Sequence, residues 1–174
     1  MLISPVNNDR RQDPAFVAAT IRTRAFLKVQ EGCNNYCTFC IVPYARGNPV
    51  SRDFENTVSE ARRLAESGYK EIVLSGVDIG AYHDRGRNLL DLVCALEDIS
   101  KLYRIRILDR KMNNMRSYAL IRHIAASEKV MPHFHLSLQL FSDTILRQWA
   151  GIHRGFYRSG IRSEISPTPP SAAM

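Results

Sequence analysis

Three cysteines within eight residues are the part of this sequence best suited to chemistry. Cys33, Cys37 and Cys40 lie in "KVQEGCNNYCTFCIVPYARG", residues 28–47, and the 174-residue chain has one further cysteine, Cys94. Clustered thiolates bind zinc or iron–sulfur clusters. Structural zinc takes four protein ligands, so the trio would need a histidine or Cys94 to complete such a site. A 4Fe–4S cluster held by only three cysteines keeps one iron open to a substrate or cofactor.

Cys94 is a poor fourth ligand by its sequence context. It lies between Val93 and Ala95 in a segment with helical periodicity, and Leu90 precedes it by four positions. This context predicts a small, buried, apolar side chain. The trio therefore favours an incompletely ligated iron–sulfur cluster, while a non-catalytic iron–sulfur or zinc-binding module remains the alternative.

Composition favours one soluble domain. The hydrophobic content is 45%, which is enough for a single core. We find no apolar run of about eighteen residues that would predict a membrane span, and "MLISPVNNDRRQDP" lacks the pattern of a secretory signal. We therefore expect a cytoplasmic protein without a membrane partner. In a reducing compartment, clustered cysteines more often bind metal or do redox chemistry than form disulfides.

The positive charge of the chain is concentrated in its second half. Residues 1–100 contain 12 Lys and Arg against 13 Asp and Glu, whereas residues 101–174 contain 12 against 4. A nucleic-acid partner is one interpretation of this excess. A solvated basic surface or a poorly structured tail is the other.

Strand and helix patterns alternate along the middle of the chain. This order predicts an α/β fold with parallel strands and about four βα units, with irregular termini. The expected helices are 51–70, which Asp53 would cap and Gly68 would end, then 88–102 and 116–128; the expected strands are 24–30, 70–76, 103–108 and 133–139. Ligands of parallel sheets bind beyond the carboxyl ends of the strands. The cysteine loop and the Ser75–Gly76 pair follow the first two strands, so both are expected at that edge.

The cysteine spacing and its flanks carry a family resemblance. Cys-x-x-x-Cys-x-x-Cys with Phe39 before the last cysteine resembles the signature of radical S-adenosylmethionine enzymes. The loop, followed by "EARRLAESGYKEIVLSGVDIGAY" and later "KVMPHFHLSLQ", is similar to the methylthiotransferases. Within these, the chain most resembles the tRNA enzymes that modify N6-threonylcarbamoyladenosine. The similarity covers about residues 24–106 and 124–139.

This resemblance implies a fold, two cofactors and a reaction. The fold would be a partial (βα) radical SAM barrel, and Cys33, Cys37 and Cys40 would ligate three irons of a 4Fe–4S cluster. S-adenosylmethionine would chelate the fourth iron, and one electron from an unknown donor would release a 5′-deoxyadenosyl radical. In the family, C2 of a tRNA adenosine is the carbon that is then methylthiolated.

The resemblance also assigns roles to residues outside the trio. Phe39 would pack beside the adenine of S-adenosylmethionine. Ser75 and Gly76 correspond to the segment that holds its methionine amino group. By their position rather than by the resemblance, Arg46 and Arg52, which flank the loop, are candidates to contact RNA phosphate or the cofactor carboxylate. Plain surface charges are the alternative interpretation.

Several segments depart from the family pattern. Members of that family carry a second-cluster domain and an RNA-binding β-domain, and we expect neither within this sequence. "ILDRKMNNMRS" and "LQLFSD" replace characteristic turns of the family. We therefore expect a truncated or diverged core at residues 24–150, between a linker at 1–23 and a disordered tail at 151–174. The function predicted is an incomplete radical SAM core related to tRNA methylthiotransferases; the alternatives are a non-catalytic metal-binding fragment and an inactive pseudo-enzyme.

Overall fold

A three-stranded parallel sheet organises the chain. The computed structural model describes residues 23–108 and 118–133. In it, β1 (Arg24–Lys28), β4 (Glu71–Ser75) and β7 (Arg104–Ile107) pair in the order β1-β4-β7, with both pairings parallel. The predicted α/β fold with parallel strands is confirmed.

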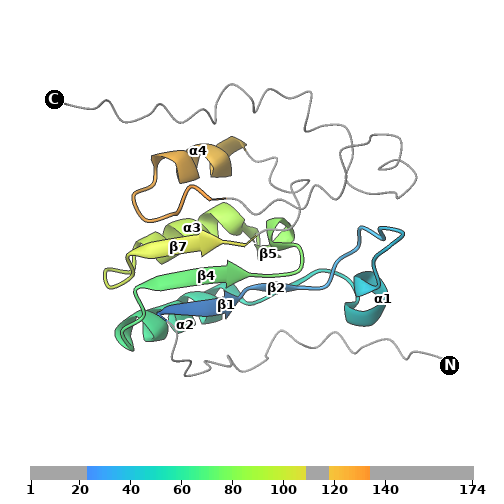
Figure 1. Ribbon diagram of the computed structural model, residues 1–174, viewed down its shortest axis with the longest axis horizontal. Coiled ribbons are helices and arrows are strands. Elements are labelled where there is room, and N and C mark those ends of the chain that lie inside the picture. Colours follow the sequence, from blue (N-terminus) through green and yellow to red (C-terminus); the bar gives the residue numbers. More distant parts are fainter. Residues whose placement is uncertain (1–22, 109–117, 134–174) are drawn as a thin grey trace.

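Helices connect and follow these strands in the predicted order. Helix α2 (Phe54–Glu66) joins β1 to β4, α3 (Leu89–Glu97) joins β4 to β7, and α4 (Tyr118–Ala126) follows β7 (Figure 1). After α4, the chain returns to the sheet, because Val130 forms a parallel bridge with Ile105 of β7. The backbone therefore begins a fourth βα unit beside β7. The predicted fourth strand, 133–139, lies outside the described residues from position 134 onward.

Local sequence signals explain where α2 begins and ends. The carboxylate of Asp53 accepts a hydrogen bond from the backbone N–H of Asn56 at 2.9 Å, as expected of an N-cap. Gly68 follows the helix with a φ of +99°, a conformation that favours glycine. Both predicted signals are confirmed, although α2 is shorter at each end than the predicted span 51–70.

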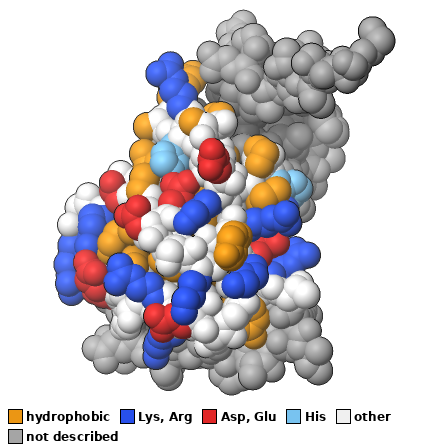
Figure 2. All heavy atoms as spheres, turned by 90° about the vertical axis from the view of Figure 1, so that its left-hand side faces the viewer, with side chains coloured by type: hydrophobic (Ala, Val, Ile, Leu, Met, Phe, Trp, Pro, Cys, Tyr) orange, Lys and Arg blue, Asp and Glu red, His pale blue; other side chains and the backbone are white. Residues whose placement is uncertain are grey.

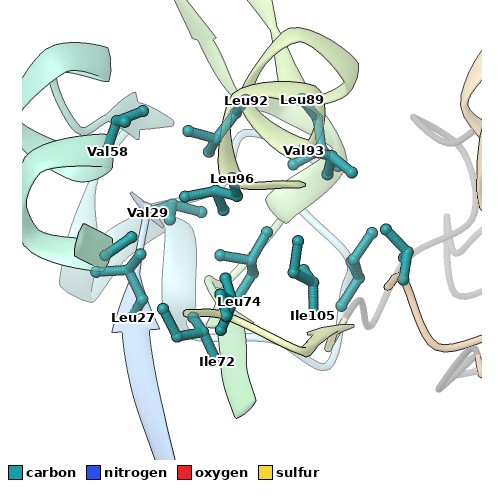
Figure 3. Close-up of a cluster of buried hydrophobic side chains, with 14 of the residues drawn as sticks. Leu27, Val29, Val58, Ile72, Leu74, Leu89, Leu92, Val93, Leu96 and Ile105 are labelled. Atoms are coloured by element: carbon teal, nitrogen blue, oxygen red, sulfur yellow. The ribbon is translucent and has the colours of Figure 1, made fainter. Parts of the chain in front are cut away.

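The core lies between the sheet and its helices. Ala25 and Leu27 of β1 point into it, whereas Phe26 between them is 48% exposed on the other face. Figure 3 shows Leu27, Ile72 and Leu74 of the sheet facing apolar side chains of the helices. The close-up labels the cluster Leu27, Val29, Val58, Ile72, Leu74, Leu89, Leu92, Val93, Leu96 and Ile105.

Shorter elements lie at the end of the sheet where the strands finish. They are β2 (Gln30–Glu31), α1 (Val42–Arg46), β3 (Val50–Ser51), the 3₁₀ turn η2 (Ile79–Ala81), β5 (His83–Asp84) and β6 (Arg87–Asn88). Sequence patterns predicted most of these segments as loops or as a strand end, whereas Ser51 of β3 and Asn88 of β6 fell within the predicted helices 51–70 and 88–102. None of the described helices has the length and apolarity needed to cross a bilayer.

The proposed division at 1–23, 24–150 and 151–174 stays a prediction. Most of both terminal segments lies outside the described residues. The departures at "ILDRKMNNMRS" and "LQLFSD" also fall largely or entirely there.

Candidate functional site

The cysteine loop projects beyond the carboxyl ends of the parallel strands. In Figure 1, α1 lies past the tips of β1 and β4, on the side predicted for a ligand site. Strand β1 passes through Val29 into β2, which pairs antiparallel with β3. Because β2 and β3 are paired, the two ends of residues 32–49 lie side by side, and these residues form a loop that projects from the edge of the sheet.

Gly32 closes the base of this loop. The backbone N–H of Cys33 donates to the carbonyl of Gly47 at 3.0 Å. Gly32 has a φ of +74°, and a Cβ at this position would lie 2.1 Å from the carbonyl oxygen of Asn48. A side chain therefore cannot occupy position 32 unless the backbone of the closing segment moves.

A buried glutamine joins the cysteine loop to the loop after β4. Gln30 is 2% exposed, and its Oε1 accepts from the backbone N–H groups of Val77 at 3.0 Å and Asp78 at 2.7 Å. Its Nε2 donates to the carbonyls of Glu31 and Gly32 at 2.7 and 2.9 Å. One side chain thus uses both ends of its amide to fix the two candidate segments relative to each other.

Gly76 leaves room for this glutamine. A Cβ on Gly76 would lie 3.0 Å from Oε1 of Gln30 and 3.2 Å from its Cβ. The preceding residue, Ser75, ends β4, and its carbonyl accepts from the N–H of Val29 at 2.9 Å. Ser75 and Gly76 are therefore beside the base of the cysteine loop, as the sequence predicted for the second strand end.

The three loop cysteines are shielded to different degrees and none forms a disulfide. Cys33 and Cys37 are buried and Cys40 is partly buried. The N–H of Cys40 donates to the carbonyl of Cys37 at 2.9 Å. The three loop thiols do not all lie within 4.8 Å of one another, so they are spread more widely than the ligands of one ion. In the described part of the chain, a different set of three side chains meets that distance.

Asn35 brings a polar contact to the first cysteine. Its Nδ2 donates to Sγ of Cys33 at 3.1 Å and to Oδ2 of Asp78 at 3.0 Å. Asp78 is 1% exposed and comes from the loop after β4. The amide is thus oriented by a carboxylate and supplies a hydrogen bond to a sulfur, an arrangement that stabilises negative charge on that sulfur.

Apolar side chains around the cysteines face outward. Tyr36, Phe39, Ile41 and Tyr44 are between 49% and 67% exposed. Tyr36 and Tyr44 contact each other edge-to-face, with ring centroids 5.7 Å apart. Phe39 therefore does not belong to the core of the domain.

The two flanking arginines both have carboxylate partners. Arg46 is half exposed, and its Nη1 lies 3.5 Å from Oε1 of Glu31. Arg52 is largely buried and forms an ion pair with Glu60 of α2. The predicted contact of these residues with RNA or cofactor is untested, and for Arg52 it would require the guanidinium to leave Glu60.

Tyr82 supports the short segment between β3 and α2 that carries Arg52. Its hydroxyl donates to the carbonyl of Arg52 at 3.0 Å. Burial, followed by the negative charge of Asp84, raises the pKa of Tyr82 to about 12. The neutral phenol is thus the form that the folded chain favours.

The prediction for Cys94 was wrong. Its side chain is partly exposed, and its Sγ lies 3.8 Å from Nε2 of His123 on α4. Helical periodicity places Cys94 on α3 correctly, but it does not reveal that a polar cluster forms where α4 packs beside it. No sequence signal pairs two helices at this position.

Charges of both signs alternate on the face opposite the cysteine loop. Figure 2 shows Lys and Arg side chains interspersed with Asp and Glu rather than gathered in one basic patch. Of the 12 basic residues after position 100, five lie in the described ranges 101–108 and 118–133. Most of the predicted basic excess is therefore outside the described residues, and its partner is untested.

Comparison with known proteins decides the family. Residues 27–159 match the Radical SAM superfamily, a span that includes the cysteine loop and all three parallel strands except the start of β1. The chain belongs to the radical SAM superfamily. The resemblance drawn from the Cys-x-x-x-Cys-x-x-Cys spacing is confirmed.

Several curated relatives of this radical SAM chain have names of tRNA-modifying enzymes. A threonylcarbamoyladenosine tRNA methylthiotransferase of Aquifex aeolicus is 44% identical over 136 residues, which cover 78% of this chain and 32% of the relative. The enzyme of the same name from Bacillus subtilis is 41% identical over 138 residues, covering 78% of this chain and 30% of the relative.

A second group of relatives has another nucleoside in its name. A tRNA-2-methylthio-N(6)-dimethylallyladenosine synthase of Roseobacter denitrificans is 43% identical over 129 residues, covering 71% of this chain and 29% of the relative. The radical SAM chain thus spans about a third of the length of the curated relatives it matches. Similarity of this order to both groups leaves the nucleoside open.

We predict that Gly32→Ala destabilises this radical SAM chain more than Gly86→Ala. Both glycines have positive φ, +74° and +84°, but a Cβ at Gly86 meets nothing within 4 Å. The left-handed conformation alone costs about 1–2 kcal/mol, and the collision with Asn48 should raise the loss at Gly32 to roughly 2–5 kcal/mol. Urea unfolding of the two variants measures the difference, and equal losses would contradict the close approach.

We predict that the difference in unfolding free energy between wild type and Tyr82→Phe changes as the pH rises from 10 to 12, because wild type loses stability that the variant does not have. An unfolded tyrosine ionises near pH 10 and folded Tyr82 near 12. The stability from the protonated phenol is therefore complete below pH 10 and is lost as the pH rises to 12. The loss should be roughly 2 kcal/mol in wild type relative to the variant. Denaturant unfolding across this range tests it; a constant gap would show that Tyr82 ionises normally.

Proposed function

We propose that this chain is a radical SAM core that holds a 4Fe–4S cluster through Cys33, Cys37 and Cys40 and binds S-adenosylmethionine beside it. The observation that carries the proposal is the position of the cysteine loop. It leaves the carboxyl edge of a parallel sheet, it is closed at its base by Gly32, and Gln30 ties it to the loop after β4. The family match supports both cofactors as a class.

The residues present fit the cluster by donor chemistry. Three thiols on one loop are the preferred ligands of iron–sulfur clusters. Each would bind a different iron, which requires sulfurs farther apart than ligands that share one ion. The two buried cysteines and the partly buried Cys40 limit the access of water to such a group. When bound, the cluster supplies the electron that cleaves the sulfonium of S-adenosylmethionine.

The chain's own residues would hold and shield the cofactors. The amide of Asn35 would stabilise the thiolate of Cys33, since it already donates to this sulfur. Phe39, exposed on the loop, would pack its ring beside the adenine. Ser75 and the side-chain-free Gly76 would receive the methionine end of the cofactor. Exclusion of water by these groups matters because a primary carbon radical reacts with whatever lies nearest.

We extend the proposal to methylthiolation at C2 of a tRNA adenosine, with N6-threonylcarbamoyladenosine as the first candidate. The names of the relatives support tRNA as the substrate class. Because the chain covers about a third of those relatives, sulfur donation and tRNA binding would need parts outside the matched region. Arg46, which is half exposed, is better placed than Arg52 to reach RNA phosphate.

We predict that alanine at any of Cys33, Cys37 or Cys40 removes most of the cluster iron after anaerobic reconstitution. Loss of one thiolate leaves a second iron without a protein ligand. Asn34→Ala is the matched control, because Asn34 is an exposed residue of the same loop, and it should retain full iron. Iron and sulfide analysis with the visible absorption spectrum measures the outcome.

The same preparations separate binding from reaction. Wild type with a reductant and S-adenosylmethionine should release 5′-deoxyadenosine, and the three cysteine variants should release none. A cluster without cleavage would support the non-catalytic iron–sulfur alternative. A colourless zinc-loaded protein, or iron content indifferent to all three substitutions, would overturn the proposal.

We predict that Asn35→Ala shifts the reduction potential of the bound cluster to a more negative value. The hydrogen bond from Nδ2 of Asn35 to Cys33 stabilises the extra negative charge of the reduced state, and its removal withdraws that stabilisation. Asn34→Ala again provides the control on the neighbouring residue. Redox titration monitored by paramagnetic resonance tests this. A potential equal to that of the control would show that Asn35 does not hydrogen-bond Cys33 when the cluster is bound.

A further inference from the structure

A second group of metal-binding side chains lies between helices α3 and α4, apart from the cysteine loop. Cys94 and Glu97 are three residues apart on α3, so they lie on one face of the helix. His123 faces them from α4, which packs against α3 (Figure 1). Their ligand atoms all lie within 4.8 Å of one another, the only such set of three in the described part of the chain.

The geometry of this group is close to that of a metal site. Nε2 of His123 contacts a carboxylate oxygen of Glu97 directly and lies 3.8 Å from Sγ of Cys94. A tetrahedral zinc ion with bonds of about 2.0–2.3 Å places its ligand atoms about 3.5 Å apart. Small rotations of the three side chains would therefore bring all of them onto one ion.

The surroundings of Glu97 hold its carboxylate in place. The hydroxyl of Ser127 donates to the second carboxylate oxygen, Oε1, and the same hydroxyl accepts from the N–H of Val130 at 2.9 Å. Nζ of Lys129 donates to the backbone carbonyls of Glu97 and Ile99. Outer contacts of this kind are common around metal-ligating groups.

The electrostatics of the group suit a cation. The carboxylates of Glu97, Asp91 and Asp98 place negative charge around the Cys94 side chain. This charge attracts a divalent ion, which displaces the thiol proton on binding. Glu97 is 19% exposed and His123 is 32% exposed, so an ion can reach them from solvent.

We propose that Cys94, Glu97 and His123 form a zinc site that joins α3 to α4. Thiolate, imidazole and carboxylate are the ligands that zinc takes in proteins, and three protein ligands leave a fourth position for water. The site tethers the helix after β7, and hence the start of the fourth βα unit, to the helix before it. It is independent of the cluster proposed at the cysteine loop.

The four-cysteine content of the chain allows a direct test. With Cys33, Cys37 and Cys40 all replaced by Ser, Cys94 is the sole remaining thiol, so any thiolate-to-cobalt charge-transfer band must come from it. Titration of this variant with Co²⁺ should give such a band at one ion per chain, and Zn²⁺ should displace it. Adding Cys94→Ser or His123→Gln should abolish the band.

A graded variant distinguishes a built site from a lone thiol. Ser127→Ala leaves all three ligands but removes the hydroxyl that fixes Glu97, and it should weaken Zn²⁺ binding about 10- to 100-fold.

Two outcomes of the cobalt titration would contradict the site. Absence of the thiolate-to-cobalt band in the triple variant would overturn the proposal and leave His123 and Glu97 as a hydrogen-bonded pair. A band indifferent to His123→Gln would overturn it equally, because Cys94 would then bind cobalt alone.

Thermal unfolding of the intact chain provides a second measurement that does not require the triple variant to fold. Added Zn²⁺ should raise the midpoint of the wild-type chain, since a ligand bound to the folded state stabilises it. The rise should be reduced in Cys94→Ser and in Glu97→Gln. An undiminished rise in both variants would assign the zinc effect to other residues and contradict the site.

Discussion

The buried amide of Gln30 is the contact on which the geometry of the candidate site depends. It leaves β2 at the point where the chain turns away from the sheet. It bonds the adjacent backbone of Glu31 and Gly32 and also the backbone of Val77 and Asp78, which lie 47 and 48 residues after Gln30 in the sequence. Removal of this side chain would leave buried N–H groups without a partner, at a cost of about 1–3 kcal/mol for each. The cysteine loop and the Ser75–Gly76 segment therefore have a fixed relation before any cofactor is present, and binding need not order them.

Local patterns in the sequence were sufficient for the scaffold. The residue pattern of 24–30 predicted β1, the Asp53 cap predicted the start of α2, and the order of the elements predicted parallel pairing. These features depend on neighbours in the chain, which the sequence displays directly. The cysteine spacing belongs to the same class of signal, since it falls within eight residues.

Contacts between distant residues were beyond such patterns. Gln30 was assigned only to the end of a strand, and no local pattern indicated that its polar side chain would be only 2% exposed. The Asn35–Asp78 hydrogen bond spans 43 residues and the pairing of His123 with Glu97 spans 26. Cys94 was misjudged for this reason, because the burial of a helical side chain depends on which helix packs beside it.

The central claim is that three thiolates hold an iron–sulfur cluster whose open iron binds S-adenosylmethionine. The most direct measurement is the paramagnetic resonance spectrum of the anaerobically reconstituted and reduced chain, recorded with and without S-adenosylmethionine. We expect the signal of one reduced 4Fe–4S cluster, altered when the cofactor's amino and carboxylate groups occupy the open iron. A spectrum that S-adenosylmethionine leaves unchanged, or a protein with no cluster signal at all, would contradict the account.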